Sequence, residues 1–95
     1  MDERIAHTAV MGHPLQSLTD EELRLDLYPL TTSPRPLEVL AWVRFGPRPL
    51  QVRARALRWT QKAVGIEFEL GDQTLRTWVW ANAVDRAQDP ERAAR

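Results

Sequence analysis

Residues 63–80, AVGIEFELGDQTLRTWVW, decide the fold class. Apolar and polar side chains alternate from Val64 to Leu70, which is the period of a β-strand with one buried face. Gly71-Asp72 is the kind of two-residue connection that joins antiparallel strands in a tight hairpin. A second alternating run follows from Gln73 to Ala81. This stretch therefore predicts two antiparallel strands, at residues 63–70 and 73–81.

Two further alternating runs precede this hairpin. Residues 37–45 alternate throughout, and residues 50–60 alternate until the phase changes by one residue between Ala56 and Leu57. Such a change of phase is typical of a β-bulge or a sharp bend. It also moves Trp59 onto the apolar side of the strand, so we expect Trp59 among the interior side chains. Between the two runs, Gly46-Pro47-Arg48-Pro49 predicts a turn.

Leu18-Thr19-Asp20-Glu21-Glu22-Leu23 predicts the start of a helix. Thr19 and Glu22 have the spacing of a capping box, and Leu18 and Leu23 that of a hydrophobic staple. Pro29 ends the pattern, so we expect a short helix over residues 20–28, with Leu23 and Leu27 on one face. The leucines at 23, 25 and 27 also alternate with a period of two, so a strand is the alternative here.

Together these elements predict a mainly β fold with one short N-terminal helix. Four to five antiparallel strands with a bend in the second fit a small, SH3-like β-barrel. The fifth strand would come from residues 8–11, and closure of the barrel would make the first and fourth strands of the meander neighbours. An open, twisted sheet with the helix on one face is the alternative. We expect a single β-barrel domain over residues 1–84, including a proline-stiffened connector at residues 31–36, and a charged, flexible tail at residues 85–95.

Length and composition limit the function classes. A chain of 95 residues fits one small domain. It contains no cysteine, which excludes disulfides, thiolate metal sites and a cysteine nucleophile. We find no long apolar run and no signal-peptide pattern, and we therefore expect a cytoplasmic protein that does not enter a membrane.

The formal net charge of zero hides an uneven distribution. Residues 1–36 carry three Arg and six acidic side chains, a net charge of −3, whereas residues 37–84 carry seven basic and four acidic side chains, a net charge of +3. The two parts can attract each other within the fold. Alternatively, the basic part can face a polyanion, which the neutral total does not exclude.

Catalytic and metal-binding patterns are poorly represented. His7 and His13 are the only histidines, and they lack the further ligands that a metal site needs. Glu67 and Glu69 share one strand face and could imitate a pair of catalytic carboxylates. More often, such a pair lies on a solvated strand face and interacts with arginines on the neighbouring strand, here Arg53 or Arg55. We therefore expect no enzyme activity, no metal and no cofactor.

Arginine and tryptophan give the stronger functional indication. Trp42 and Arg44 share one face of the first predicted strand, and three further side chains of these types share one face of the fourth. A sheet face of this composition binds single-stranded nucleic acid by stacking bases on the rings and pairing phosphates with arginine. Two arginines of the second strand would extend the positive surface. The candidate binding residues are Trp42, Arg44, Arg53, Arg55, Arg76, Trp78 and Trp80.

Two other interpretations of the tryptophans stay open. In a domain this small, at least two of the four can form part of the core, with Trp80 packed beneath the predicted helix. The same aromatic face can instead bind a protein partner or a second copy of the chain, because Trp and Arg are both enriched in protein interfaces.

Four segments of the chain are distinctive in combination: Gly12-His13-Pro14, Ser17–Leu23, Leu40-Ala41-Trp42-Val43-Arg44 and Trp78-Val79-Trp80-Ala81-Asn82-Ala83-Val84. Together they resemble a family of small uncharacterised proteins of high-GC Gram-positive bacteria. The resemblance covers most of the chain and implies a bacterial, cytoplasmic protein, but no activity and no functional residues. A GC-rich genome would also explain why Lys62 is the only lysine. Val64-Gly65-Ile66-Glu67-Phe68 is similar to one strand of the PilZ domain, but the arginine spacing and the polar motif of that family are absent.

Overall fold

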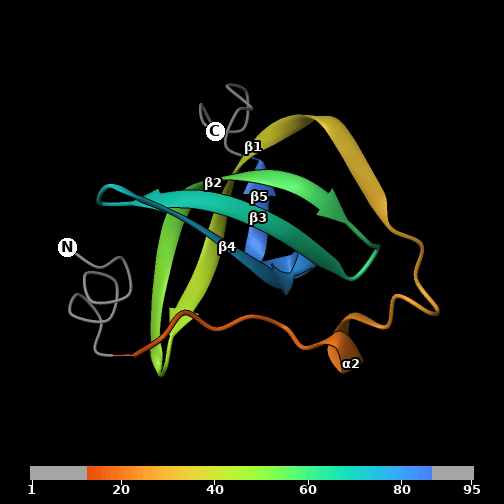
Figure 1. The fold of residues 1–95 in the computed structure, drawn as a ribbon, viewed down its shortest axis with the longest axis horizontal. Coiled ribbons are helices and arrows are strands. Elements are labelled where there is room, and N and C mark those ends of the chain that lie inside the picture. The colour runs from red at the N-terminus through yellow and green to blue at the C-terminus, as the bar shows by residue number, and fades with distance from the viewer. Residues whose placement is uncertain (1–12, 87–95) are drawn as a thin grey trace.

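The computed structural model describes residues 13–86, which form one antiparallel sheet of five strands (Figure 1). The hydrogen-bonded order is β4-β3-β2-β1-β5. The helical elements are α2 (Asp20–Leu23) and the short 3-10 turn η1 (Ala81–Ala83). The prediction of a mainly β fold with four to five antiparallel strands and a short helix is confirmed. The strands are β1 (Thr31–Phe45), β2 (Arg48–Trp59), β3 (Ala63–Leu70), β4 (Gln73–Trp80) and β5 (Val84–Arg86).

The bulge predicted in the second strand is present. In the β2–β3 ladder, Ala56 pairs with Ile66 and Arg58 pairs with Gly65, so that Leu57 is the extra residue on β2. One extra residue exchanges the two faces of a strand, because side chains alternate with a period of two. Trp59 consequently turns inward and packs against the core, as the change of phase predicted.

One of the two glycine-containing turns is tighter than the sequence indicated. Only Gly46-Pro47 separates β1 from β2, so β2 begins at Arg48 and not at residue 50. Gly71-Asp72 joins β3 to β4 as predicted. Gly46 has a φ of 64° and Gly71 a φ of 66°, a left-handed conformation that glycine adopts without steric cost.

The prediction of a connector at residues 31–36 is wrong, because β1 begins at Thr31. Thr31 and Thr32 pair with Trp59 and Arg58. The register then shifts before Leu37 pairs with Ala56, so that Ser33–Pro36 stand opposite a single residue of β2. The two prolines lie within this irregularity, where a strand can hold residues that have no N–H to donate.

The predicted helix is too long. The capping box is present: Glu22 N–H donates to Thr19 Oγ1, and Thr19 N–H donates to Glu22 Oε1. The helix ends at Leu23, because Arg24 adopts a left-handed conformation with a φ of 49°. Leu23 is buried, but Leu27 is 60% exposed, so the expected apolar face does not continue beyond the first turn.

The fifth strand comes from the C-terminal side of the meander. Val84–Arg86 pair with Val39–Ala41 of β1, although residues 85 and 86 were predicted to belong to a tail. The predicted strand at residues 8–11 and the rest of the tail, residues 87–95, lie outside the described residues.

β1 and β4 are not hydrogen-bonded to each other, so the expectation that they are neighbouring strands is wrong. Residues 15–18 run between them instead. Gln16 N–H donates to Arg44 O at 2.9 Å, and Leu18 N–H donates to Trp78 O at 3.0 Å. This short segment therefore connects the end of β1 beyond its pairing with β5 to the edge of β4 (Figure 1).

The core lies on one face of the sheet and contains no fully buried tryptophan. Phe45 and Phe68 are its largest fully buried side chains. Trp59 and several aliphatic side chains pack around this cluster, with part of their surface exposed. The buried residues of the cluster are Val39, Ala41, Val43, Phe45, Ala54, Ala56, Ile66, Phe68 and Val79.

Candidate functional site

The side chains of β1 that point away from the core include Trp42 and Arg44. Their neighbours on both sides, Ala41, Val43 and Phe45, are buried, so the strand alternation fixes the outward direction of these two. Across the ladder, Trp42 pairs with Gln51 of β2, and Arg44 pairs with Pro49. Arg44 Nη1 donates to Pro47 O at 3.3 Å, which holds the guanidinium beside the β1–β2 turn.

Trp78 and Trp80 point outward from β4, and small residues on β3 lie opposite each of them. Trp78 pairs with Gly65, and Trp80 pairs with Ala63. A Cβ atom at Gly65 would lie 3.3 Å from Cε2 and Cζ2 of Trp78, so the indole ring lies directly on the glycine backbone. This packing leaves Trp78 half-buried and fixes its ring on the outer face of the sheet.

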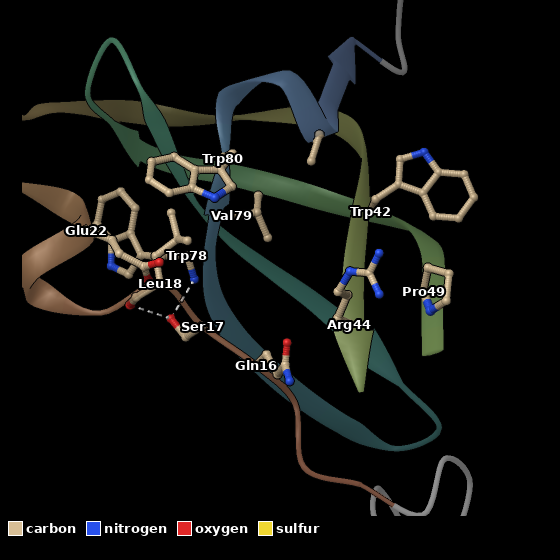
Figure 2. Close-up of a pocket in the computed structure, with 11 residues that line it drawn as sticks. Gln16, Ser17, Leu18, Glu22, Trp42, Arg44, Pro49, Trp78, Val79 and Trp80 are labelled. Carbon is tan, nitrogen blue, oxygen red and sulfur yellow. Dashed lines mark hydrogen bonds between the residues drawn. The ribbon is translucent and has the colours of Figure 1, made fainter. Parts of the chain in front are cut away.

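These four side chains meet at a groove that lies over the unpaired seam between β1 and β4 (Figure 2). The groove has a volume of about 490 Å³. Figure 2 shows Trp78 and Trp80 beside α2 on one side, and Trp42, Arg44 and Pro49 on the other. The lining residues are Gln16, Ser17, Leu18, Glu22, Trp42, Arg44, Pro49, Trp78, Val79, Trp80 and Ala83.

Residues 16–18 form one end of this groove, and hydrogen bonds hold them on β4. Trp78 N–H donates to Ser17 Oγ at 3.0 Å, and Thr77 Oγ1 donates to Gln16 O. Leu18 leads directly into the capping box of α2, so Glu22 is brought to the groove by the same segment.

Two of the tryptophans are exposed although a complete core is available. Trp42 is 49% exposed and Trp80 is 41% exposed. The interpretation of Trp80 as a core side chain covered by the helix is therefore wrong, whereas Trp59 does pack against the core. From the sequence alone, these rings could equally have been part of the core. The structure places both of them, exposed, at a groove.

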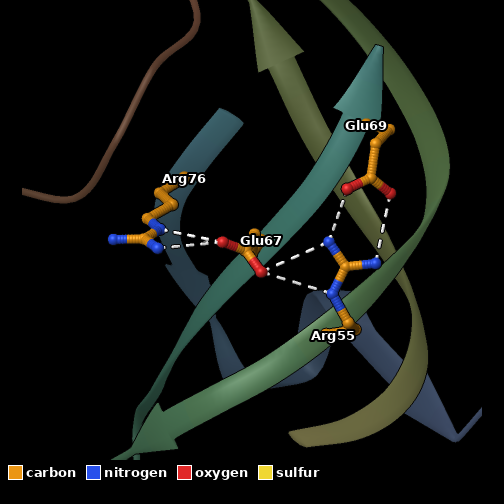
Figure 3. Close-up of polar contacts among 4 residues, drawn as sticks. All are labelled: Arg55, Glu67, Glu69 and Arg76. Carbon is orange, nitrogen blue, oxygen red and sulfur yellow. Dashed lines mark hydrogen bonds and ion pairs between the residues drawn. The ribbon is translucent and has the colours of Figure 1, made fainter. Parts of the chain in front are cut away.

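Arg55 and Arg76 lie in the same outer face but form a separate ion-pair network (Figure 3). Arg55 Nη2 lies 3.2 Å from Glu67 Oε1 and 2.7 Å from Glu69 Oε2. Arg76 Nη2 lies 3.0 Å from Glu67 Oε2. The hydrogen bond to Glu69 is the main reason that the pKa of Arg55 is raised, and the bonds from Arg55 hold the pKa of Glu69 below its ordinary value. Both arginines are thus already neutralised by carboxylates.

Arg53 is exposed on the outer face of β2, where it pairs with Leu40 and not with Trp42. It does not line the groove. Of the seven candidate residues, the structure brings Trp42, Arg44, Trp78 and Trp80 together and leaves Arg53, Arg55 and Arg76 outside.

Sequence reasoning missed Leu18, Glu22, Pro49 and Ala83 as groove residues. Leu18 and Glu22 were recognised for their part in starting the helix, and nothing in that pattern shows that α2 lies beside β4. Pro49 could have been found, because a turn reduced to Gly46-Pro47 places it directly opposite Arg44.

Comparisons with family models, curated proteins and solved structures find no match to this chain. Within residues 13–86, no three His, Asp or Glu side chains are grouped in a way that could hold a metal ion. No helix in this part of the chain is long and apolar enough to cross a membrane.

Proposed function

We propose that this chain is a non-enzymatic protein-interaction module that binds part of a partner in the groove between β1 and β4. The observation that carries the proposal is the exposure of Trp42 and Trp80, at 49% and 41%, on the two sides of that groove. A folded domain gains free energy by burying such rings, and both are left accessible here although the core is closed by other residues.

The composition of the groove supports a protein partner. Its lining is more apolar than polar, and it includes Leu18, Val79 and Ala83 besides the tryptophans, with Glu22 and Arg44 as its charged side chains. Tryptophan and arginine are the side chains that most often dominate the binding energy of protein interfaces. A volume of about 490 Å³ is in the range of sites that enclose a few side chains of a partner.

We further propose that the sheet and residues 15–18 together form a small barrel of the SH3-like type. The bulge at Leu57 bends β2, and the hydrogen bonds of Gln16 and Leu18 connect β1 to β4. In such a barrel the groove would lie over the place where residues 15–18 join β1 to β4.

Nucleic-acid binding is the second candidate function. It is favoured by Arg44 and Arg53, which share the outer face of β1 and β2 with Trp42 and have no acidic partner among residues 13–86 within ion-pair distance. It ranks second because Arg55 and Arg76 are already paired with Glu67 and Glu69, so half of the expected positive surface is neutralised.

A selection experiment distinguishes the two. Random peptides displayed on phage are selected on the immobilised protein, and selected peptides are titrated while tryptophan fluorescence is followed. Single- and double-stranded oligonucleotides are titrated in parallel at low and moderate salt. We expect peptide binding that changes little with salt and is lost in Trp42→Ala but kept in Leu27→Ala, which shortens an exposed apolar side chain outside the groove.

Tight oligonucleotide binding that weakens steeply with salt would instead support the second candidate, because phosphate contacts release counterions. Selected peptides that bind Trp42→Ala and the wild type equally would show that the groove is not the binding site. Sizing chromatography at high concentration tests whether a second copy is the partner, since a dimer that Trp42→Ala dissociates would identify it.

A further inference from the structure

The two sides of the groove carry opposite charges. Glu22 lies on the side formed by Trp78 and Trp80, next to α2 (Figure 2). Arg44 lies on the side formed by Trp42 and Pro49. A groove of this kind selects its occupant by charge pattern as well as by apolar contact.

The acidic side is held in a fixed position. Glu22 Oε1 accepts hydrogen bonds from Thr19 N at 2.9 Å and from Thr19 Oγ1 at 3.3 Å, so the carboxylate cannot swing away from α2. No Lys or Arg among residues 13–86 forms an ion pair with it. The faces of tryptophan rings attract cations, and a fixed carboxylate beside two indoles strengthens that attraction. This side therefore fits a basic side chain.

The basic side is also without an internal partner. Arg44 donates only to Pro47 O among the described residues, through Nη1 at 3.3 Å, and no carboxylate of residues 13–86 lies within ion-pair distance of it. A guanidinium can bind a carboxylate through two parallel N–H donors, and the Nη1 bond to Pro47 O leaves Arg44 with further donors for such a pair. This side therefore fits an acidic side chain.

The middle of the groove is apolar. Val79 lies between the two charged sides (Figure 2), and the exposed rings of Trp42 and Trp80 lie on either side of it. Proline packs well on tryptophan, and a polyproline II segment loses little conformational entropy when it binds because it is already extended. A proline-containing middle therefore suits this part of the groove.

Resting on the proposed function, we propose that the occupant is an extended, proline-containing peptide segment of a partner protein, with a basic side chain near one end and an acidic side chain near the other. The basic side chain binds beside Glu22, Trp78 and Trp80, and the acidic side chain binds Arg44. The same arrangement discriminates against polyanions, because Glu22 and its neighbours Asp20 and Glu21 repel phosphates at one end of the groove.

Four blocked synthetic peptides of equal length test this charge pattern. The first has an arginine near one end, a proline-rich middle and a glutamate near the other end. In the second and third, alanine replaces the arginine or the glutamate, and in the fourth it replaces both. Dissociation constants come from calorimetry, and indole N–H signals in NMR spectra report which tryptophans are contacted. We expect each charged side chain to improve affinity about two- to fivefold, with shifts at Trp42, Trp78 and Trp80 and none at Trp59.

Two neutralising variants assign the charges to the two sides. Glu22→Gln keeps an acceptor for Thr19 N–H, because Gln also serves in a capping box, but it removes the charge. It should abolish the advantage of the arginine and leave that of the glutamate, and Arg44→Gln should do the reverse. Glu21→Gln and Arg48→Gln are the matched controls, since both side chains are exposed near the groove without lining it.

The outcomes separate this inference from the proposed function. If all four peptides bind equally in a way that needs Trp42, or if Glu22→Gln and Arg44→Gln change nothing, the charge pattern is wrong while the groove remains a peptide-binding site. If none of the peptides binds and peptides selected from the random library also fail to bind, both proposals are overturned.

Discussion

Replacing Gly46 by alanine should destabilise the fold much more than the same change at Gly71. Both glycines lie in turns and have almost the same left-handed conformation, with φ values of 64° and 66°. Their surroundings differ. A Cβ atom at Gly46 would lie 2.5 Å from Cγ of His13 and 2.8 Å from its Cβ and Nδ1, whereas a Cβ atom at Gly71 would meet nothing within 4 Å.

The expected magnitudes follow from this difference. A left-handed conformation costs a residue with a side chain about 1–2 kcal/mol, partly offset by the lower entropy of the unfolded alanine chain, about 0.4–1 kcal/mol. Gly71→Ala should therefore lower the free energy of unfolding by about 1 kcal/mol. Gly46→Ala must also displace the imidazole of His13, and crowding of this kind costs about 1–3 kcal/mol, which gives about 2–4 kcal/mol in total.

Urea unfolding followed by tryptophan fluorescence measures both effects. With a slope of about 1 kcal/mol per molar for a small protein, the midpoint of Gly46→Ala should lie about 1–3 M below that of Gly71→Ala. In a His13→Gly background the two glycine substitutions should become equivalent, because the whole crowded side chain, Cβ included, is gone. Equal losses in the wild-type background, or a Gly46→Ala effect that His13→Gly does not relieve, would refute the contact between residue 13 and the β1–β2 turn.

Three further changes probe other parts of the fold. Thr19→Ala removes the capping acceptor of α2 and should lower the free energy of unfolding by about 1 kcal/mol, whereas Thr19→Ser should not, as urea unfolding can check. Deletion of Leu57 removes the extra residue of the bulge and should leave a regular ladder in which Arg58 and Trp59 keep their partners and their faces; we expect the cooperative thermal transition to remain, and loss of that transition would contradict the assigned register. The lowered pKa of Glu69 means that its pairing with Arg55 stabilises the fold above the ordinary carboxyl value of 4.5 and is lost as the pH falls through the lowered folded-state value. Between pH 7 and acid, the urea midpoint of Glu69→Gln should therefore fall less than that of the wild type. The difference should be small because the Glu69 side chain is exposed, and an equal fall in the two proteins would count against the pair.

The sheet was predictable wherever the side chains alternate between a buried and an exposed face. β3 has the predicted bounds, and the change of phase at Leu57 located the bulge and the inward position of Trp59. The errors occur where no such alternation exists. The left-handed turn at Arg24 ends α2 without a glycine or a proline, and residues 31–36 join β1 despite two prolines, because the register shift allows them to lie beside the ladder.

The candidate site was predicted only in part, because its residues come from segments that lie far apart in the sequence. Trp42, Arg44, Trp78 and Trp80 were expected to meet through pairing of the first and last strands of the meander. They meet although these strands are unpaired, because residues 16–18 are hydrogen-bonded to both. The pairing of Arg55 with Glu67 and Glu69 was considered from the strand pattern, but which arginine would be neutralised depends on register, which only the structure reveals.

The hydrogen bonds that attach residues 16 and 17 to residues 77 and 78 join positions 61 apart in the sequence. The hairpins of the meander, in contrast, connect strands that follow one another in the chain, and short loops close faster and at a lower entropic cost than long ones. We therefore expect the meander to form early in folding and the N-terminal segment to attach to it late. Substitutions such as Ser17→Ala should then accelerate unfolding while leaving the folding rate nearly unchanged. Residues 16–18, which form one end of the groove, are therefore the part of the molecule that attaches last in folding and detaches first in unfolding.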